Sequence, residues 1–297
     1  MNIRLPRCTV ETPFSASRGN IQRNLLYVNH KYDITLSVIN CANLYMQFLG
    51  ALEELMAAMS ELADKLIVIT GAGGGIGRAT ARLCHEAGAR LVLLDVATPE
   101  MVASHLGALA SHAVIHQVDN TDRSEVERIA QETGPVYGVV DTAALCPAGD
   151  WLEPGWDDVL DRTLAVNIKG PINVTRAFFP GMVEREEGRI VLCGSVAGWM
   201  GGILSGPDYA FTKGGIHAFV RWLSRRGAPH NVLVNGVAPG ATDTGMIQGK
   251  GYNPESLPLR RFAEPEEIAA AIIFLLGPSG SYMSGSIMDI NGGIFFH

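Results

Sequence analysis

Short uncharged runs rich in Val, Ile and Leu recur along residues 61–297, and longer stretches with helically spaced apolar residues separate them. A short apolar run bounded by glycine or a polar turn is typical of a strand buried on both faces. Such runs alternate with helices where a parallel sheet is covered on both faces. The pattern therefore predicts a doubly wound α/β domain with a seven-stranded parallel sheet in the order 3-2-1-4-5-6-7.

The expected strands share this apolar, β-branched composition and are Leu66–Thr70, Arg90–Asp95, Ala113–Val118, Val136–Asp141, Arg189–Gly194, Asn231–Ala238 and Ser286–Ile290. The expected helices fill the gaps and are Arg78–Glu86, Pro99–Ala110, Arg123–Glu132, Trp156–Val183, Asp208–Arg226 and Pro265–Leu276. Right-handed crossovers place the ligand crevice at the carboxyl ends of the strands. No internal repeat or low-complexity linker divides residues 61–297, so we interpret them as a single domain.

Residues 1–60 differ from this pattern and are interpreted as an N-terminal extension. Up to Lys31 they carry five basic residues and one acid, which mildly resembles an organelle transit peptide. Ile34–Leu52 is uncharged, but its polar residues and glycine favour an amphipathic helix or a poorly ordered tail over a membrane span. Met56 and Met59 could serve as start sites, so an upstream start-site artefact is slightly favoured over a functional extension.

Composition narrows the class of protein. Hydrophobic residues make up 47% and charged residues 18%, an ordinary globular mixture. The net charge of -7 argues against a nucleic-acid partner, which would need a basic stripe. The five cysteines contain no CxxC pair and the histidines are scattered, so we expect no disulfide framework and no metal site. This usage suits a reducing compartment, and we expect a cytoplasmic location.

The glycine-rich stretch Leu66–Gly77, LIVITGAGGGIG, lies between the first expected strand and the first expected helix. Glycines there allow a tight turn and let the backbone approach a pyrophosphate, which the N–H groups at the helix start would face. A P-loop is excluded because the loop ends Gly-Arg-Ala, and strict GxGxxG spacing fails at Ile76. The candidate cofactor residues of this loop are Thr70, Gly71, Gly73, Gly75, Ile76 and Gly77.

Two carboxylates end neighbouring strands of the predicted sheet. Asp95 ends the second strand, 18 residues after Gly77. A carboxylate at that position accepts hydrogen bonds from both adenosine ribose hydroxyls and repels a 2′-phosphate, so it predicts NAD rather than NADP. Asp119 ends the third strand, where the adenine ring would rest. The alternative for each carboxylate is a helix N-cap, for Asp119 on the helix that starts near Thr121.

The strongest chemical signal is Tyr209-Ala-Phe-Thr-Lys213 in an expected helix. Residues four apart share a helix face, and a lysine charge beside a phenol favours phenolate, which predicts a tyrosine pKa lowered toward neutrality. Such a tyrosine can exchange a proton with an alcohol/ketone pair. Ser195 ends a buried strand 14 residues earlier, where ligands bind. A serine hydrolase elbow is absent, because Cys193 stands where that motif needs glycine.

In combination, these motifs make residues 64–293 resemble the short-chain dehydrogenase/reductase family, of the compact single-domain kind. The resemblance implies a Rossmann fold and hydride transfer between NAD and a secondary alcohol or ketone. It implies that Tyr209 is the acid/base and that Lys213 lowers its pKa and holds the nicotinamide ribose. It further implies that Ser195 polarises the substrate oxygen, and that Asn167 holds, through its backbone, a water that links Lys213 to solvent.

The resemblance also assigns cofactor contacts outside the glycine loop, to Asp95, Asp119, Ala143, Tyr209, Lys213, Pro239, Gly240, Thr242 and Thr244. One motif departs, since the family usually shows Asn-Asn-Ala-Gly where this chain has Asp141-Thr142-Ala143-Ala144. A buried Asp141 carboxylate is costly unless it is hydrogen-bonded. Ala144 puts a methyl group where glycine lets the backbone pass close to the cofactor.

Several alternatives stay open. Pro258–Ile268 resembles the 3-oxoacyl-[acyl-carrier-protein] reductase branch, which usually prefers NADPH, whereas Asp95 favours a general NAD-dependent alcohol dehydrogenase. Two further hypotheses assign the protein to other functional classes. One is a catalytically silent NAD-binding regulator, and the other is an enzyme tethered to a membrane by Ile34–Leu52. The long helices Trp156–Val183 and Asp208–Arg226 resemble those that pair between family subunits. We therefore expect a homotetramer, with a dimer second, acting on a small alcohol or ketone.

Overall fold

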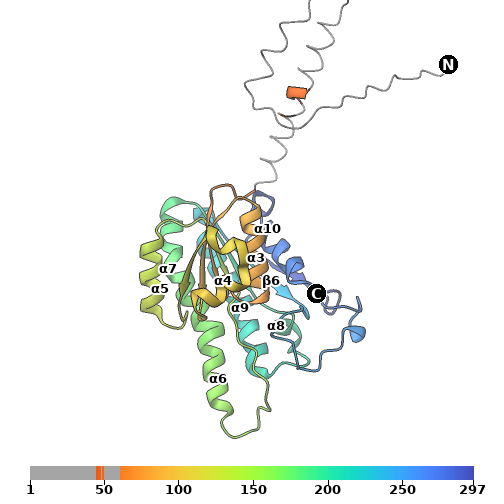
Figure 1. Ribbon diagram of the computed structural model, residues 1–297. Helices are drawn as coiled ribbons and strands as arrows, with labels where there is room; N and C mark the ends of the chain where they lie inside the picture. The colour runs from red at the N-terminus through yellow and green to blue at the C-terminus, as the bar shows by residue number, and fades with distance from the viewer. Residues whose placement is uncertain (1–44, 48, 50–60) are drawn as a thin grey trace, which may run out of the picture. The chain divides into compact units, whose positions relative to one another are not determined.

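The computed structural model describes residues 45–47, 49 and 61–297. Within residues 61–297, seven parallel strands form one sheet in the order β3-β2-β1-β4-β5-β6-β7 (Figure 1), which confirms the predicted fold class and strand order. Most of the extension predicted over residues 1–60, including the start-site candidates, lies outside the described residues. Among the helices of the described part of the chain, none is long and apolar enough to cross a membrane.

The strands run over Leu66–Thr70 (β1), Arg90–Asp95 (β2), Ala113–Gln117 (β3), Gly138–Asp141 (β4), Gly188–Cys193 (β5), Val232–Pro239 (β6) and Ile287–Ile290 (β7). The helices run over Gly75–Glu86 (α3), Pro99–Leu106 (α4), Arg123–Thr133 (α5), Trp156–Leu164 (α6), Gly170–Arg185 (α7), Ala197–Met200 (α8), Pro207–Gly227 (α9) and Pro265–Leu276 (α10). A π-helical turn, Ala165–Lys169 (η2), joins α6 to α7, and short 3₁₀ helices cover Gly107–His112, Ala228–His230, Pro254–Ser256 and Pro278–Gly280.

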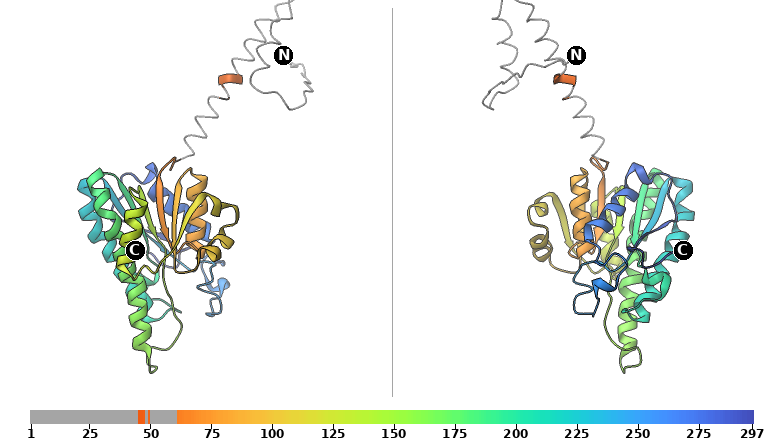
Figure 2. Two further views of the ribbon diagram at one scale, coloured as in Figure 1. Left: turned by 60° about the vertical axis from the view of Figure 1, so that its left-hand side comes forward. Right: turned by 90° about the vertical axis from the view of Figure 1, so that its right-hand side faces the viewer.

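The two faces of the sheet carry separate apolar clusters, because side chains alternate along each strand. In β1, Ile67 and Ile69 belong to the cluster that includes residues of α3 and α10. Val68 between them belongs to the cluster that includes residues of α5, α7 and α9. Helices therefore cover both faces (Figure 2). Burying each such side chain contributes about 1.5–3 kcal/mol, which holds the apolar strands between the helical layers.

The helix predicted as one element over Trp156–Val183 is two α-helices joined by the π-helical turn η2, so that prediction is corrected. Pro171 supplies the physical reason. Proline has no N–H, so it cannot donate the usual helical hydrogen bond to the carbonyl of Asn167, four residues earlier. The α pattern is therefore interrupted at Asn167, the residue that the family resemblance singles out.

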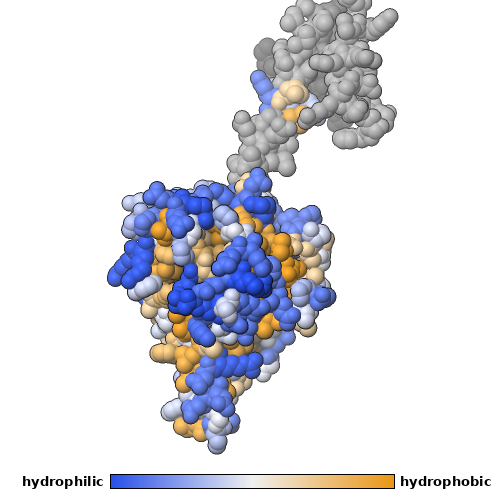
Figure 3. Space-filling view, turned by 90° about the vertical axis from the view of Figure 1, so that its left-hand side faces the viewer, coloured by the Kyte–Doolittle hydropathy of each residue, from blue (hydrophilic) through white to orange (hydrophobic). Residues whose placement is uncertain are grey.

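Other boundaries shift for local reasons. The helix predicted over Pro99–Ala110 ends at Leu106, because Gly107 has φ +59° and a 3₁₀ helix follows. The short helix α8, just after Ser195, was not expected from the sequence. Helix α6 and the loop before it project from the body of the domain (Figure 1), and the surface of this projection carries apolar patches (Figure 3). Trp151 and Leu152 in that loop are exposed.

Candidate active site

The glycine loop packs directly against the loop that follows β4. Gly71 has φ +65°, and a Cβ there would lie 2.8 Å from the Cα and backbone nitrogen of Ala143. A Cβ on Gly77 would overlap the Gly71 carbonyl oxygen. Helix α3 begins at Gly75, three residues earlier than predicted, so the loop runs straight into a helix N-terminus. The backbone N–H groups there form a cradle that fits the pyrophosphate of a dinucleotide.

Asp95 lies at this loop, as its spacing predicted. Its Oδ2 accepts a hydrogen bond of 2.9 Å from the Gly73 N–H, and its Oδ1 accepts one of 2.9 Å from the Ala97 N–H. The alternative of a helix N-cap is wrong, because Thr98 caps α4. A carboxylate has about four acceptor positions, so Asp95 retains capacity for the two hydroxyls of a ribose. The residues present therefore fit the adenosine half of a dinucleotide.

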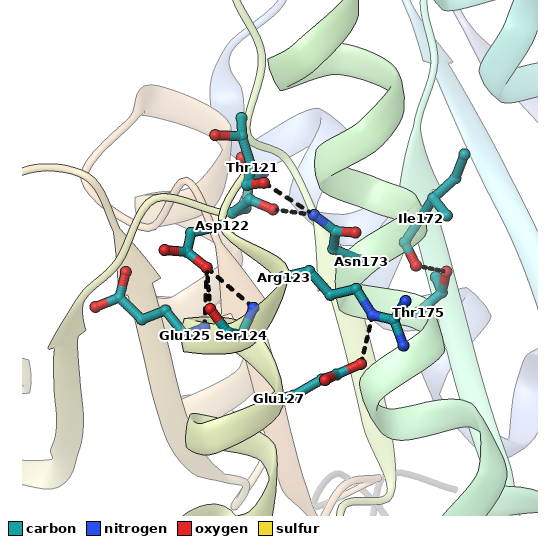
Figure 4. A network of polar contacts seen from close by, with 10 residues as sticks. Thr121, Asp122, Arg123, Ser124, Glu125, Glu127, Ile172, Asn173 and Thr175 are labelled. Atoms are coloured by element: carbon teal, nitrogen blue, oxygen red, sulfur yellow. Dashed lines mark hydrogen bonds and ion pairs between the residues drawn. The ribbon is translucent and has the colours of Figure 1, made fainter.

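Asp119 occupies an exposed turn after β3. Its carboxylate accepts a hydrogen bond of 2.9 Å from the Thr121 N–H. Helix α5 is capped instead by Asp122, which accepts from the backbone N–H groups of Ser124 and Glu125 (Figure 4). The capping interpretation of Asp119 is therefore wrong, and its contact with an adenine ring stays a prediction.

Ser195, Tyr209 and Lys213 meet at the carboxyl end of β5. The Lys213 ammonium donates a hydrogen bond of 2.7 Å to the Cys193 carbonyl oxygen and lies 5.6 Å from the centroid of the Tyr209 ring. The Ser195 hydroxyl accepts a hydrogen bond of 3.1 Å from the Ala197 N–H. A side-chain hydrogen bond joins Ser195 to Tyr209. The structure thus brings together the three side chains that the sequence singled out.

Asn167 anchors the loop after β4 from the π-helical turn. Its Oδ1 accepts a hydrogen bond of 2.7 Å from the Leu145 N–H, and its Nδ2 donates to the Leu145 carbonyl at 2.8 Å. Nδ2 also lies 3.1 Å from the Thr212 hydroxyl, which is next to Lys213 in α9. The Asn167 side chain is buried and hydrogen-bonded to Leu145 and Thr212, and the water that the family resemblance assigns to its backbone stays a prediction.

The segment after β6 reaches the same place. The Val196 N–H donates a hydrogen bond of 2.9 Å to the Pro239 carbonyl, which ties the Ser195 loop to the end of β6. Thr244 packs against the start of α3, since a Cβ on Gly75 would meet its side chain. The segment that includes Gly240 and Thr242 therefore runs from the serine to the glycine loop, as a surface that contacts a nicotinamide would.

The Tyr209 side chain is partly buried, and desolvation of its phenol raises the pKa above its ordinary value. The neighbouring thiols of Cys193 and Cys146 and the phenol of Tyr252 also raise this pKa, whereas the hydrogen bond with Ser195 lowers it. The expectation that this pKa is lowered toward neutrality is therefore wrong in this structure, because desolvation is the largest influence on it and raises it. Tyr209 is held in its proton-donating form.

The segment Asp141-Thr142-Ala143-Ala144, which differs from the usual family sequence, is joined to β1 by side-chain hydrogen bonds. Asp141 is 3% exposed, and its Oδ1 accepts a hydrogen bond of 2.5 Å from the Thr70 hydroxyl. The Thr142 hydroxyl donates a hydrogen bond of 2.7 Å to the Thr70 carbonyl. Burial raises the pKa of Asp141 to about 6, and the Thr70 hydrogen bond and the charge of Lys213 oppose that rise. The buried carboxylate is therefore hydrogen-bonded, the condition under which it can be tolerated.

His217 is a site residue that the sequence reasoning missed. Its Nε2 accepts a hydrogen bond of 3.4 Å from the Ser195 N–H, and its ring centroid lies 4.1 Å from that of Trp199. Burial and the neighbouring cations lower its pKa to about 4, so it is neutral at pH 7. The sequence spacing could have identified it, because Tyr209, Lys213 and His217 follow one another at intervals of four residues and so share one face of α9.

Across residues 61–297 and the few described residues before them, no group of three or more His, Cys, Asp and Glu side chains could hold a metal ion.

The raised pKa of Asp141 makes stability depend on pH. The folded-state pKa of about 6 exceeds the ordinary 3.8, so the protein loses stability as the pH rises through that interval. A shift of about two pKa units corresponds to roughly 3 kcal/mol. In Asp141→Asn this loss is absent, so the free energy of unfolding of the variant gains that amount over wild type between about pH 4 and 7. Urea unfolding across this range measures the difference.

Asp64→Asn is the matched control for this prediction. Asp64 is exposed, just before the amino end of β1, and its φ of 58° is one that asparagine tolerates. We expect no pH-dependent difference from wild type in that variant. A stability difference for Asp141→Asn that does not change with pH would contradict the raised pKa.

Comparison with known proteins agrees with this geometry. Residues 65–254 match the family model described as short chain dehydrogenase. The chain is 37% identical over 240 residues to an acetoacetyl-CoA reductase of Synechocystis, covering 78% of this chain and 96% of that protein. It is 35% identical over 241 residues to a galactitol 2-dehydrogenase (L-tagatose-forming) of Cereibacter sphaeroides, covering 76% and 92%.

A similar solved structure is that of a 3-oxoacyl-[acyl-carrier protein] reductase with bound NAD from Brucella melitensis. Its TM-score is 0.74 at 29% sequence identity, and the match covers 82% of this chain and 96% of that one. The family match extends over β1 to β6, and therefore over the glycine loop and over the strand and helix that carry the serine, the tyrosine and the lysine. We conclude that this protein belongs to the short-chain dehydrogenase family and is an oxidoreductase.

Proposed function

We propose that the protein interconverts a secondary alcohol and a ketone by hydride transfer with NAD(H). The observation that carries this proposal is the meeting of Ser195, Tyr209 and Lys213 at the carboxyl end of β5. The glycine loop and Asp95 lie at the ends of the neighbouring strands β1 and β2. A dinucleotide held by that loop and Asp95 would extend across the strand ends toward the tyrosine.

Each side chain has one task in this proposal. The glycine loop and Asp95 would hold NADH, which would supply a hydride for the carbonyl carbon of the ketone. Tyr209 donates its phenolic proton to the carbonyl oxygen in reduction and takes it back in oxidation. The Ser195 hydroxyl donates a hydrogen bond to the same oxygen, and the fixed charge of Lys213 stabilises the phenolate that reduction leaves behind.

Two loops would enclose the substrate. The Lys250 ammonium donates a hydrogen bond to the Cys146 carbonyl, which joins the loop after β6 to the loop after β4. Cys146 and Tyr252, from these two loops, both lie close enough to Tyr209 to raise its pKa. Closure of such loops would exclude water from the reacting centre.

A second candidate is reduction of a 3-oxoacyl thioester. Two of the similar proteins, an acetoacetyl-CoA reductase and a 3-oxoacyl-[acyl-carrier protein] reductase, favour it. The galactitol 2-dehydrogenase favours the alcohol instead. Both candidates use the same proton donor and differ in what the loops between β4 and α6 and after β6 admit, so a substrate panel separates them.

Replacement of Tyr209, the proposed acid/base, should lower kcat sharply. We expect Tyr209→Phe to lower kcat by a factor of about 10²–10⁴, because the substrate oxygen loses its proton donor. Steady-state rates over a panel of secondary alcohols, ketones and acetoacetyl-CoA measure this. The matched control is Tyr282→Phe, since Tyr282 is fully exposed and should leave the rates unchanged. If Tyr209→Phe turned over substrate as fast as wild type, Tyr209 would not be the proton donor. If wild type bound NAD but turned over no substrate of the panel, the protein would be a catalytically silent NAD-binding regulator.

Asp95 sets the expected cofactor preference. We expect kcat/KM to be higher with NADH than with NADPH, because a 2′-phosphate would lie against the Asp95 carboxylate. In Asp95→Asn the repulsion is gone, so the ratio of kcat/KM for NADPH to that for NADH should rise by about tenfold or more. A wild-type preference for NADPH would contradict the assignment of NAD and support the thioester reductase branch.

We also propose a homotetramer, with a dimer second. Phe211 and Trp222 on α9 are 68% and 51% exposed, and Arg226 lies 3.5 Å from the Trp222 ring centroid. Such apolar exposure on a helix is typical of an interface between subunits. Sedimentation velocity at micromolar concentration should show a tetramer, and Trp222→Glu should shift the distribution toward smaller species. A wild-type monomer would refute the proposal.

A further inference from the structure

Asp141 lies on the face of the sheet that α9 covers. In the registers of the sheet, Asp141 of β4 is the partner of Thr70 in β1 and of Leu192 in β5. Val139 and Leu192 belong to the apolar cluster that includes residues of α9, and Val140 belongs to the opposite cluster. Because side chains alternate along a strand, Asp141 points to the same face as Val139.

Lys213 approaches the same strand ends from α9. Its ammonium donates to the carbonyl of Cys193, the residue that follows Leu192 in β5. Lys213 is 3% exposed, as is Asp141. Its positive charge acts on the Asp141 carboxyl group and favours the ionised form. A buried ammonium and a buried carboxyl group therefore interact at the carboxyl ends of the neighbouring strands β5 and β4.

Few titratable side chains besides Lys213 lie close to Tyr209 in the described part of the chain. The titratable side chains that act on Tyr209 from the surrounding elements are Cys193 of β5, Cys146 of the loop after β4 and Tyr252 of the loop after β6. Thiols and phenols are uncharged until alkaline pH. His217, one turn further along α9, is neutral at pH 7 because its pKa is lowered. Asp141 is thus the group near Lys213 whose charge changes in the weakly acidic range.

We infer that Asp141 is a second anionic partner of Lys213, which competes with the Tyr209 phenolate for the lysine charge and thereby keeps Tyr209 protonated. This inference rests on the proposed function. Asp141 acts through Lys213 and does not reach the substrate, so it is a positioning residue. A protonated tyrosine is the form that reduction of a carbonyl requires, whereas oxidation of an alcohol requires phenolate. The aspartate would therefore bias the site toward reduction at neutral pH.

The inference predicts how the pH profile responds to loss of the charge. Asp141→Asn frees the Lys213 charge for the phenolate, so the rising limb of kcat/KM for alcohol oxidation should move about one pH unit lower. The falling limb for ketone reduction should move by the same amount in the same direction. Asp64→Asn, the exposed carboxylate outside the site, should leave both limbs in place. Limbs that coincide in wild type and Asp141→Asn would overturn the inference.

A second readout does not depend on turnover. The near-ultraviolet absorbance of phenolate, measured during an alkaline titration as the difference between each protein and its Tyr209→Phe counterpart, reports Tyr209 alone. We expect the Tyr209 transition in Asp141→Asn to lie about one pH unit below that in the Asp141 protein. Absence of wild-type turnover would refute the proposed function, and this titration would still decide the role of Asp141. Identical transitions would overturn it.

Thr70→Val provides a variant that keeps the carboxylate. It removes the hydrogen bond of 2.5 Å that favours ionised Asp141, so the aspartate stays protonated to higher pH. We expect the Tyr209 transition in Thr70→Val to be unchanged at alkaline pH, where Asp141 is ionised in both proteins. In weakly acidic solution, where oxidation depends on the small phenolate fraction, its rate of alcohol oxidation relative to Asp141→Asn should approach unity at a higher pH than for wild type. A Thr70→Val profile that shifts like that of Asp141→Asn at alkaline pH would contradict the inference.

Discussion

The cost of burying charge at the carboxyl ends of the central strands is the constraint on which this site depends. Asp141 and Lys213 are both nearly inaccessible to solvent. Neither would remain charged in an apolar interior without partners, because desolvation of one ion costs several kcal/mol. Hydrogen bonds supply those partners, from Thr70 to the carboxylate and from the ammonium to the Cys193 carbonyl. Strand register brings these groups together, so the parallel sheet itself organises the charges.

The same register explains why motifs far apart in the sequence form one site. Residues that end β1, β4 and β5 become neighbours because those strands are adjacent and parallel. The glycine loop can then approach the loop after β4 closely, since Gly71 has no side chain to separate them. The departure from the family motif follows this logic as well. Asp141 and Thr142 both bond to Thr70 and so join the two strands through side chains.

Local sequence patterns predicted the sheet well, because each strand is a short apolar run between polar turns. The seven expected strands and their order match the structure, and so does the spacing of Asp95 from the glycine loop. The prediction of one helix over Trp156–Val183 was wrong because the apolar spacing continues through Pro171, whereas the α-helical hydrogen bonds do not. The prediction of a lowered Tyr209 pKa was wrong for a different reason. Desolvation raises this pKa, and so do Cys146 and Tyr252, which lie on loops distant in sequence, and the spacing of Tyr209 and Lys213 contains no information on these loops.

In the proposed reaction, this site transfers a hydride to a carbonyl carbon while Tyr209 supplies the proton. The most direct measurement uses NADH that carries deuterium at its transferable position, together with a ketone or 3-oxoacyl thioester substrate. Mass spectrometry of the product alcohol should show one deuterium on the carbinol carbon with the wild-type protein, and at least about a hundredfold less labelled alcohol in the same time with Tyr209→Phe. Product alcohol that lacks the label, or NADH that binds and is never consumed with any carbonyl compound, would contradict the account.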